Sequence, residues 1–309
     1  MALFEFEMSL PTFFIINQVV VSIYLFFTVI SWIGNTIIMV VTVRSKSLHN
    51  PCNILIGIQA FTDLFMQSSH FFYAYCAYNK VLVTFTTCFW ANFPFISAFD
   101  FSTMMMFFIA LDRYICVHYP IFYNQMDTRL YIFGVVSTCL AYAIVLKVLS
   151  YFSLTDERTM CLIAESMTGF VENVWLGAGA LVNTGVIICY YRLSKHFKQI
   201  NTANNRDYNT INRSLRTLIF VYIFGWFFTT VMGSIILLIS PNHRVYVALI
   251  TTIGITANIN LAAPFFVYYF QSTLYRREIR KLFGLKKQTN SVSYHTSAVA
   301  TATASAAIH

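Results

Sequence analysis

Seven long apolar stretches divide this sequence, and each is long enough to cross a lipid bilayer as a helix. A membrane-spanning helix needs about 20 mostly apolar residues, whereas a membrane-spanning β-strand needs only about 10. The stretches therefore predict an all-α membrane protein, a seven-transmembrane helix bundle. The predicted spans are residues 18–43, 53–77, 85–116, 130–152, 174–196, 214–240 and 245–270.

The chain carries few charged residues for its length. Of its 309 residues, 58% are hydrophobic and 10% are charged, against roughly 45–50% and 25% in soluble domains. This composition excludes an ordinary water-soluble enzyme, a disordered chain and a secreted disulfide scaffold. The net charge of +8 does not indicate nucleic-acid binding, because the basic residues lie between the apolar stretches.

The distribution of the basic residues predicts the orientation in the membrane. With the amino terminus outside, the inner loops and the C-terminal segment hold 16 of the 20 lysines and arginines. Short loops rich in these residues remain in the cytoplasm. We therefore expect a multi-pass plasma-membrane protein with a short extracellular N-terminus, residues 1–17, a bundle over 18–270, and a cytoplasmic C-terminus.

Two segments follow the last predicted span. Residues 271–287 place apolar and basic side chains on opposite sides of a helix, which predicts a short amphipathic eighth helix lying on anionic membrane lipid on the cytoplasmic side. Residues 288–309 contain no Asp, Glu, Lys or Arg and are rich in Ser, Thr and Ala, so we expect a disordered tail. Its hydroxyl groups are candidate sites for a kinase, with arrestin as a further candidate partner, although no specific motif supports either.

A set of motifs in order along the spans narrows the class of protein. The motifs are Gly34-Asn35 in the first span, Asp63 in the second, Asp112-Arg113-Tyr114 at the end of the third, Trp226 in the sixth and Pro264 in the seventh. Together they resemble the rhodopsin-like (class A) G-protein-coupled receptors, and most of all the nematode serpentine chemoreceptors of the Srsx class. The resemblance runs from about residue 17 to residue 283.

This resemblance implies a chemosensory receptor, with sensory cilia as a candidate location. An extracellular small molecule would bind between the outer halves of the spans, and a heterotrimeric G protein would bind at the cytoplasmic face. Asp112, Arg113 and Tyr114 would form the G-protein coupling motif, with Asp112 pairing with Arg113 at rest. The alternative is that Arg113 extends to the membrane interface without a signalling role and that Asp112 neutralises its charge.

Asp63 lies in the middle of a span, where a carboxylate costs roughly 2.5–3.5 kcal/mol to insert and must find polar partners. The resemblance places Asn35 and Asn260 beside it in an interior polar cluster. In many relatives such a cluster holds a sodium ion. A sodium site at Asp63 and a hydrogen-bonded cluster without metal both remain open, and no other cofactor is expected.

Asp100 is a second carboxylate within a predicted span. It either binds a polar group of the ligand or is satisfied internally, by Asn92 or by a partner on another helix. Amine receptors of the family carry their anchoring aspartate five residues earlier, where this chain has Phe95. An amine receptor is therefore disfavoured. Lys147, near the outer end of the fourth span, is expected to extend outward to the membrane surface.

The aromatic residues suggest a ligand pocket, and the resemblance assigns the activation switch. Phe93, Phe95, Phe99 and Trp226 would line an apolar pocket, with Asp100 at its edge. Trp226 would shift on activation, but Phe228 replaces the usual proline two residues later, so Gly225 and Gly233 are the candidates for softening that helix. The switch continues in the seventh span.

In that span Pro264 is followed by Tyr268 after four residues instead of three, which we interpret as one inserted residue. The resemblance further implies a disulfide between Cys88 and Cys161, both on the outer side, where the compartment is oxidising.

Other functions are less consistent with these residues. A receptor for an internal neuropeptide or transmitter is the main alternative, because acidic outer loops would attract a cationic peptide. A seven-span ligand-gated ion channel would use Asp63 and Asp100 in its pore but leaves the coupling motif unexplained. No enzyme is expected, since no nucleophile and base stand together. A retinal photoreceptor would need a lysine in residues 245–270, and there is none.

Overall fold

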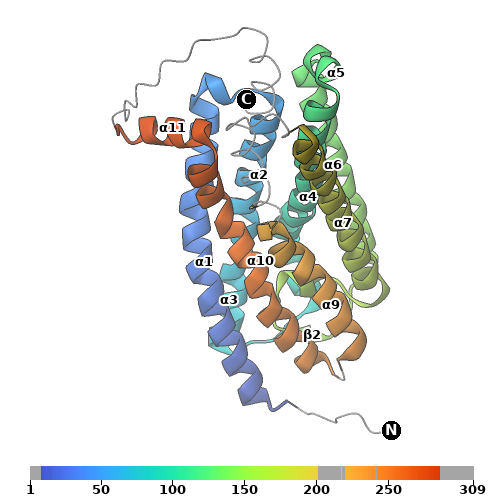
Figure 1. Ribbon diagram of the computed structural model, residues 1–309. Coiled ribbons are helices and arrows are strands. Elements are labelled where there is room, and N and C mark those ends of the chain that lie inside the picture. The colour runs from blue at the N-terminus through green and yellow to red at the C-terminus, as the bar shows by residue number, and fades with distance from the viewer. Residues whose placement is uncertain (1–7, 201–216, 218–219, 241, 286–309) are drawn as a thin grey trace.

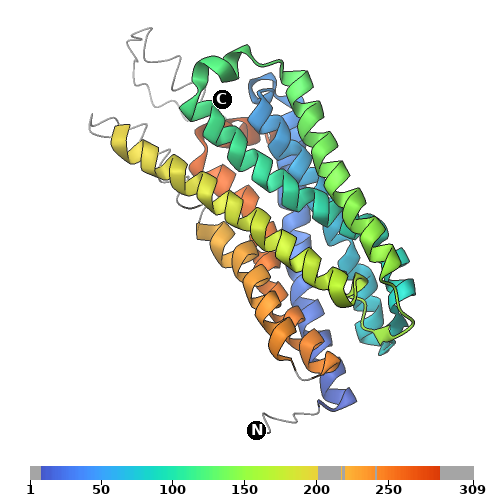
Figure 2. The same cartoon turned by 90° about the vertical axis from the view of Figure 1, so that its right-hand side faces the viewer.

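Long helices make up most of the described part of the chain, which is residues 8–200, 217, 220–240 and 242–285 of the computed structural model. Among these residues, six helices are long and apolar enough to cross a membrane. Figures 1 and 2 show them running side by side as one bundle. They are α1 (Leu10–Arg44), α4 (Phe85–His118), α6 (Thr128–Phe152), α7 (Gly169–Ile200), α10 (His243–Gln271) and the stretch Phe220–Ile239.

The second predicted span is divided into two shorter helices, α2 (Pro51–Gln67) and α3 (Ser69–Asn79). The chain tightens at Ser68, whose backbone N–H donates to the carbonyl of Phe65 and whose hydroxyl donates to the carbonyl of Leu64. Hydroxyl groups that bond back onto helix carbonyls commonly bend helices. Neither helix alone is long enough to cross a membrane, but α2 and α3 together form the second span and bring the number of spans to seven. The predicted seven-helix membrane bundle is therefore confirmed.

The sixth span changes its winding at Trp226. Residues Ile223–Phe227 form the π-helical turn η4, and the regular helix α9 (Phe228–Ile239) follows. Wide turns of this kind interrupt α-helices, frequently at functional sites. Gly225 lies inside η4, whereas Gly233 lies in the regular part of α9. The irregularity expected in this span is therefore located at the first of the two glycines.

α1 begins at Leu10, earlier than the span predicted from residue 18. Ser9 caps the helix by accepting a hydrogen bond from the backbone N–H of Thr12, and Pro11 lies in the first turn, where a missing N–H has no cost. Phe13 and Phe14 are buried in the core. Part of the segment expected as an N-terminal extension therefore belongs to the bundle.

At the end of the bundle where α1 begins, two short strands pair antiparallel. β1 (Val83–Thr84) pairs with β2 (Arg158–Thr159), with Val83 opposite Thr159 and Thr84 opposite Arg158. The 3-10 turn η2 (Ile163–Ser166) follows β2. We call this the β-ribbon end of the bundle.

The opposite end carries the short elements η1 (Lys46–Leu48), α5 (Pro120–Gln125) and α11 (Thr273–Leu282). α11 lies across the ends of α1 and α10 instead of along them (Figure 1). It buries Leu274, Tyr275 and Ile279 against these helices and turns its basic side chains outward. This is the amphipathic helix predicted from the sequence, and we call this end the α11 end.

Candidate functional site

A cavity of about 120 Å³ lies inside the bundle towards the β-ribbon end. Its wall is mostly apolar and comes from the long helices together with the η2 segment, which contributes Leu162, Ile163 and Ala164. We call it the main cavity. Phe99, Asp100, Trp175 and Trp226 are among the side chains that line it.

The charged group in the wall of the main cavity is paired inside the protein. The Asp100 carboxylate lies 2.9 Å from Nζ of Lys147, and the indole Nε1 of Trp175 donates to its other oxygen at 2.8 Å. The side chains of Asp100 and Lys147 are 1% and 6% exposed. Asp100 is therefore satisfied by two other helices, which confirms the internal alternative.

Two details predicted around Asp100 are wrong. Lys147 does not extend outward but points into the bundle, because Asp100 offers a buried counter-charge on the facing helix α4. Asn92 is not the partner of Asp100. It lies two helical turns away and donates to Sγ of Cys161 at 3.2 Å.

The aromatic residues of the predicted pocket separate into two groups. Phe99 and Trp226 both line the main cavity, and their rings meet edge to face with centroids 5.2 Å apart. Phe95 does not line the cavity, because its ring packs against Phe65 of α2, with centroids 5.4 Å apart. Phe93 packs beside Phe89 on the outer part of α4. The predicted place of Phe95 in the pocket is therefore wrong.

A second, smaller cavity of about 60 Å³ lies next to the main cavity, towards the α11 end. Asn35, Asp63 and Asn260 all line it, as the sequence predicted, and so do Pro264 and Tyr268. We call it the polar cavity. Trp226 and Leu261 line both cavities, so the indole of Trp226 and the side chain of Leu261 lie between them.

Asp63 takes its hydrogen bonds from two residues that the sequence analysis did not select. Nε2 of Gln59 donates to its Oδ1 at 2.8 Å, and the hydroxyl of Ser102 donates to the same atom at 2.7 Å. Asn35 instead donates to Ser31, and Asn260 donates to the carbonyl of Val221. A Gln four residues before the aspartate, on the same helix face, was a detectable signal.

The donor set of the polar cavity fits a sodium ion in chemical type. Asp63 and Gln59 line this cavity, and Ser102 adjoins it through its hydrogen bond to Asp63. Oε1 of Gln59 is buried without a hydrogen-bond partner among the described residues. Hard cations such as sodium prefer oxygen ligands of this kind. The carboxylate, the hydroxyl and the amide oxygen are thus the groups that would hold the ion.

The helix turn that carries Trp226 leaves no room for a side chain at Gly225. A Cβ at this position would overlap the side chain of Asn260 on α10. Because glycine is present, Asn260 reaches past it and donates to the carbonyl of Val221 at 2.9 Å. The wide turn in the sixth span is therefore held by a contact with the seventh.

The coupling motif lies at the α11 end of α4. Asp112 is fully buried, and the hydroxyl of Tyr123 in α5 donates to its two oxygens at 3.1 and 3.3 Å. No ion pair joins Asp112 to Arg113 in the described structure. Adjacent residues point in different directions around a helix, so Arg113 is directed elsewhere. The predicted direct ion pair is thus not formed, and the hydrogen-bond partner of Asp112 is Tyr123.

Arg113 interacts electrostatically with Cys52 of α2, Tyr268 of α10, Tyr190 of α7 and its neighbour Asp112. Tyr190 and Tyr268 also line the polar cavity. The arginine is therefore close to groups of the second, fifth and seventh spans. Tyr114, the third residue of the motif, stacks on His118, with ring centroids 4.2 Å apart.

In the seventh span, α10 continues through Pro264 without a break. Tyr268 lies one turn further on and contacts Tyr275 of α11, with ring centroids 4.9 Å apart. The spacing of four residues thus places Tyr268 between Arg113 and α11. Whether it acts as a switch stays a prediction.

The β-ribbon end closes over the main cavity through a disulfide and a buried acid. Cys88 and Cys161 are bonded, which confirms the predicted pair. Glu165 of η2 is 1% exposed and accepts from the backbone N–H of Leu162 at 3.1 Å. Burial raises the pKa of Glu165 from 4.5 to about 7, although hydrogen bonds from Thr159 and nearby backbone groups oppose the shift.

Comparisons with known proteins agree with this architecture. The family model of the serpentine type 7TM GPCR chemoreceptors Srsx matches residues 28–283. The curated protein opsin Rh3 of Drosophila pseudoobscura pseudoobscura is 39% identical over 64 residues, a match that spans 21% of this chain and 17% of the opsin. Because the family model covers most of the sequence, the chain belongs to the Srsx family of serpentine 7TM GPCR chemoreceptors.

Proposed function

We propose that the protein is a chemosensory G-protein-coupled receptor that binds a small uncharged molecule in the main cavity and activates a heterotrimeric G protein at the α11 end. The observation that carries this proposal is the position of Trp226, whose side chain lines both the main cavity and the polar cavity. A ligand that displaces the indole changes both cavities at once. The family membership supports the general assignment to this receptor class.

The size and charge of the main cavity support the class of ligand. A cavity of about 120 Å³ is close to the size of an engineered apolar cavity that binds benzene. Such a volume favours a single-ring or short aliphatic molecule over a peptide. The charge of Asp100 is already balanced by Lys147, so neither an amine ligand nor a cation in a channel pore finds a free carboxylate there.

Activation follows as a shift between two populations of the bundle. In the structure, Asn260 bonds to the carbonyl of Val221 just before the turn η4, and Tyr190 and Tyr268 interact electrostatically with Arg113. A ligand that moves Trp226 acts on the same turn that Asn260 holds. Release of η4 would let the sixth span move away and expose Arg113 to the G protein.

A pair of matched substitutions tests the role of Trp226. Trp226→Leu is expected to abolish G-protein activation by any compound that activates the natural receptor, because the link between the cavities is lost. Phe224→Leu is the control, since Phe224 lies in the same turn but is exposed on the bundle surface. The probes are a panel of uncharged single-ring and short aliphatic compounds, read with a promiscuous G-protein reporter and a surface-expression assay. Equal loss in both variants would contradict the proposed role.

Arg113→Ala tests the coupling end separately. We expect surface expression and ligand-induced stabilisation to remain while G-protein activation is lost, because Arg113 does not line the main cavity and the proposal assigns it to the G-protein face. If activation survived unchanged, the assignment of the coupling motif would be wrong.

We further propose that the β-ribbon end faces outside the cell and the α11 end faces the cytoplasm. The excess of lysine and arginine at the α11 end supports this orientation. A glycosylation acceptor placed before α1 and an epitope after α11 test it in intact cells. Residues 288–309, where a kinase or arrestin contact is predicted, lie outside the described residues, and a location in sensory cilia stays a prediction.

We also propose that the polar cavity binds a sodium ion at Asp63. The oxygen of Gln59, which has no hydrogen-bond partner in the part of the chain that the structure describes, and the nearby hydroxyl of Ser102 support this site. The ion would compensate the buried carboxylate charge and favour the inactive bundle.

A further inference from the structure

A basic pocket lies at the α11 end, outside both cavities described above. The last turn of α1, the turn η1 and the helix α11 surround a hollow of about 520 Å³. Four of the side chains that line it are basic, and one is acidic. They are Arg44, Lys46, Arg277 and Lys281, with Glu278 as the acid.

Glu278 holds two of these cations in place. Its Oε1 accepts from Nε of Arg277 at 2.7 Å and from Nζ of Lys281 at 2.8 Å. Burial raises the pKa of Glu278, but hydrogen bonds from Lys281, Arg277 and Ser45 outweigh this effect and hold it at about 2. The carboxylate is therefore charged at any physiological pH. One negative charge among four positive ones leaves the pocket with a net charge of about +3.

The cations remain accessible although two of them are paired. The side chains of Arg277 and Lys281 are 46% and 62% exposed, and Glu278 beneath them is 7% exposed. Arg44 and Lys46 are also exposed. A guanidinium has five N–H donors and an ammonium has three, so Arg277 and Lys281 keep free donors after binding Glu278. The pocket therefore presents donors to an anion.

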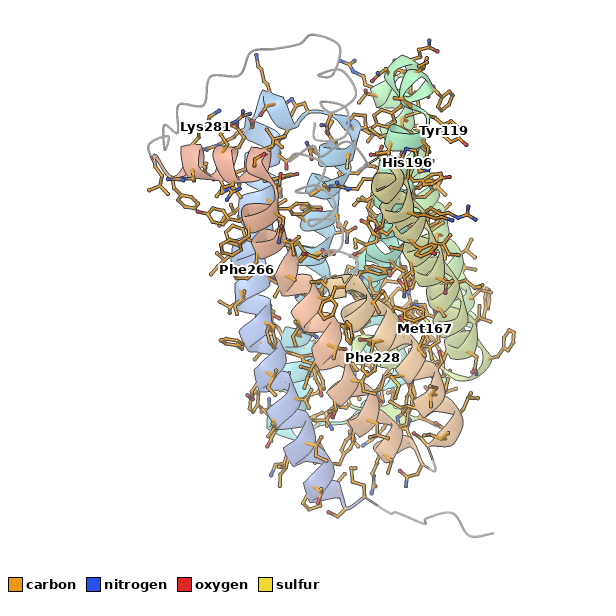
Figure 3. The ribbon with its side chains drawn as sticks, in the orientation of Figure 1. Tyr119, Met167, His196, Phe228, Phe266 and Lys281 are labelled. Carbon is orange, nitrogen blue, oxygen red and sulfur yellow. A yellow bond between two sulfur atoms is a disulfide. The ribbon has the colours of Figure 1, made fainter. Side chains whose placement is uncertain are left out.

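The position of the pocket matches the headgroup layer of a membrane. Arg44 is the last residue of the membrane-spanning helix α1, and α11 runs across the bundle at the same level (Figure 1). Phe283 and Leu285, which follow α11, are exposed apolar side chains next to this basic surface. Figure 3 shows Lys281 on α11, at the side of the bundle away from His196 and Tyr119. The pocket thus opens where lipid headgroups lie, and not at the centre of the G-protein face.

We propose that this pocket binds the headgroup of an anionic membrane lipid that carries phosphomonoester groups, such as a phosphoinositide, and that this lipid holds α11 against α1. Arginine forks and lysine ammonium groups are well suited to phosphate oxygens. Basic pockets at the cytoplasmic membrane surface recognise such headgroups, and a singly charged lipid would leave most of the charge unmatched. That the lipid belongs to the inner leaflet rests on the proposed orientation, but binding itself does not.

Binding is measured with the purified full-length protein in nanodiscs. The probes are neutral phosphatidylcholine discs alone, discs with phosphatidylserine, and discs with phosphatidylinositol bisphosphate at equal total charge. We expect preferential retention of the phosphoinositide, and about 30-fold weaker binding for the double variant Arg44→Gln, Lys46→Gln, which removes two cations near the membrane surface. No ligand or G protein is present, so the outcome does not depend on the receptor activity.

Two comparisons make this result specific. The control variant Arg129→Gln, Arg192→Gln removes the same charge from exposed positions on α6 and α7 and should bind the phosphoinositide as the natural protein does. Arg44→Lys, which keeps the charge, should retain most of the affinity and shows that loss is not due to misfolding. Equal weakening by the control pair, no preference over phosphatidylserine, or equally tight binding of soluble inositol polyphosphate without lipid would each overturn the proposal.

Discussion

Replacing Lys147 with methionine would leave the Asp100 carboxylate buried without its counter-charge. In the structure the two groups are 2.9 Å apart, and their side chains are 6% and 1% exposed. Removing one partner of a buried ion pair costs about 3–5 kcal/mol, because the remaining charge has lost its compensation. The hydrogen bond from Trp175 remains and reduces the loss. We therefore expect a decrease of about 3 kcal/mol in the stability of the bundle.

Thermal unfolding of the detergent-solubilised protein measures this loss. A change of about 3 kcal/mol corresponds to a melting temperature lower by roughly 5–10 °C in a chain of this size. The double variant Asp100→Asn, Lys147→Met removes both charges and should recover most of the difference. Arg129→Met, an exposed change on the same helix α6, is the control and should melt close to the natural protein.

The same variant makes a prediction about ligand choice. Because Asp100 lines the main cavity, Lys147→Met leaves a carboxylate available to a protonated amine. We expect single-ring amines such as benzylamine to stabilise this variant. They should not stabilise the natural protein or the double variant. If Lys147→Met were as stable as the natural protein, or the double variant no more stable than the single one, the pair would not balance charge as argued.

Three further outcomes follow from groups around the two cavities. Because the folded pKa of Glu165, about 7, lies above its ordinary value of 4.5, stability should fall as pH rises from about 4.5 to 7 and then level off, and Glu165→Gln should flatten the melting temperature over this range. Sodium chloride should raise the melting temperature above that in N-methylglucamine chloride, and Asp63→Asn should remove the difference; an unchanged difference would exclude the sodium site. Cys161→Ser should destabilise the protein by about 2–5 kcal/mol, because the disulfide joins residues 73 apart, and reductant should have the same effect on the natural protein alone.

The number and approximate positions of the membrane spans were predictable because they depend on local chemistry. A helix in hydrocarbon needs a continuous apolar stretch, and this requirement can be read directly from the residues. The break at Ser68 was not predicted, since it depends on how the hydroxyl and the backbone N–H of this residue bond to the preceding turn. The early start of α1 at Leu10 depends on a cap at Ser9 that composition alone does not reveal.

Side-chain contacts between different helices were harder to predict than the position of each residue along its own helix. The sequence identifies Asp100 and Lys147 as charges within spans, but not the rotation of α4 against α6 that brings them to 2.9 Å. The rotation of α4 about its axis also could not be predicted, and Phe95 was therefore expected in the pocket. In the structure its ring packs against Phe65 instead. Asp63 and Asn35 were correctly placed at one cavity because motif order carries over the family's arrangement, yet the bonds of Asp63 go to Gln59 and Ser102.

Gly225 allows an irregular turn in the sixth span, where the family usually has a proline. Its missing side chain gives Asn260 access to the carbonyl of Val221, and the π turn that exposes this carbonyl carries Trp226. Gly225→Ala would push the Asn260 side chain away and break that bond, at a cost of about 1–3 kcal/mol from overpacking. If the contact holds the inactive bundle, the variant should activate the G protein without ligand while its ligand-free melting temperature falls. Gly233→Ala, in the regular part of α9, should crowd Ile250 and lower stability without raising basal activity. If Gly225→Ala lowered the stability without raising ligand-free G-protein activation, the contact would stabilise the fold but would not hold the inactive state.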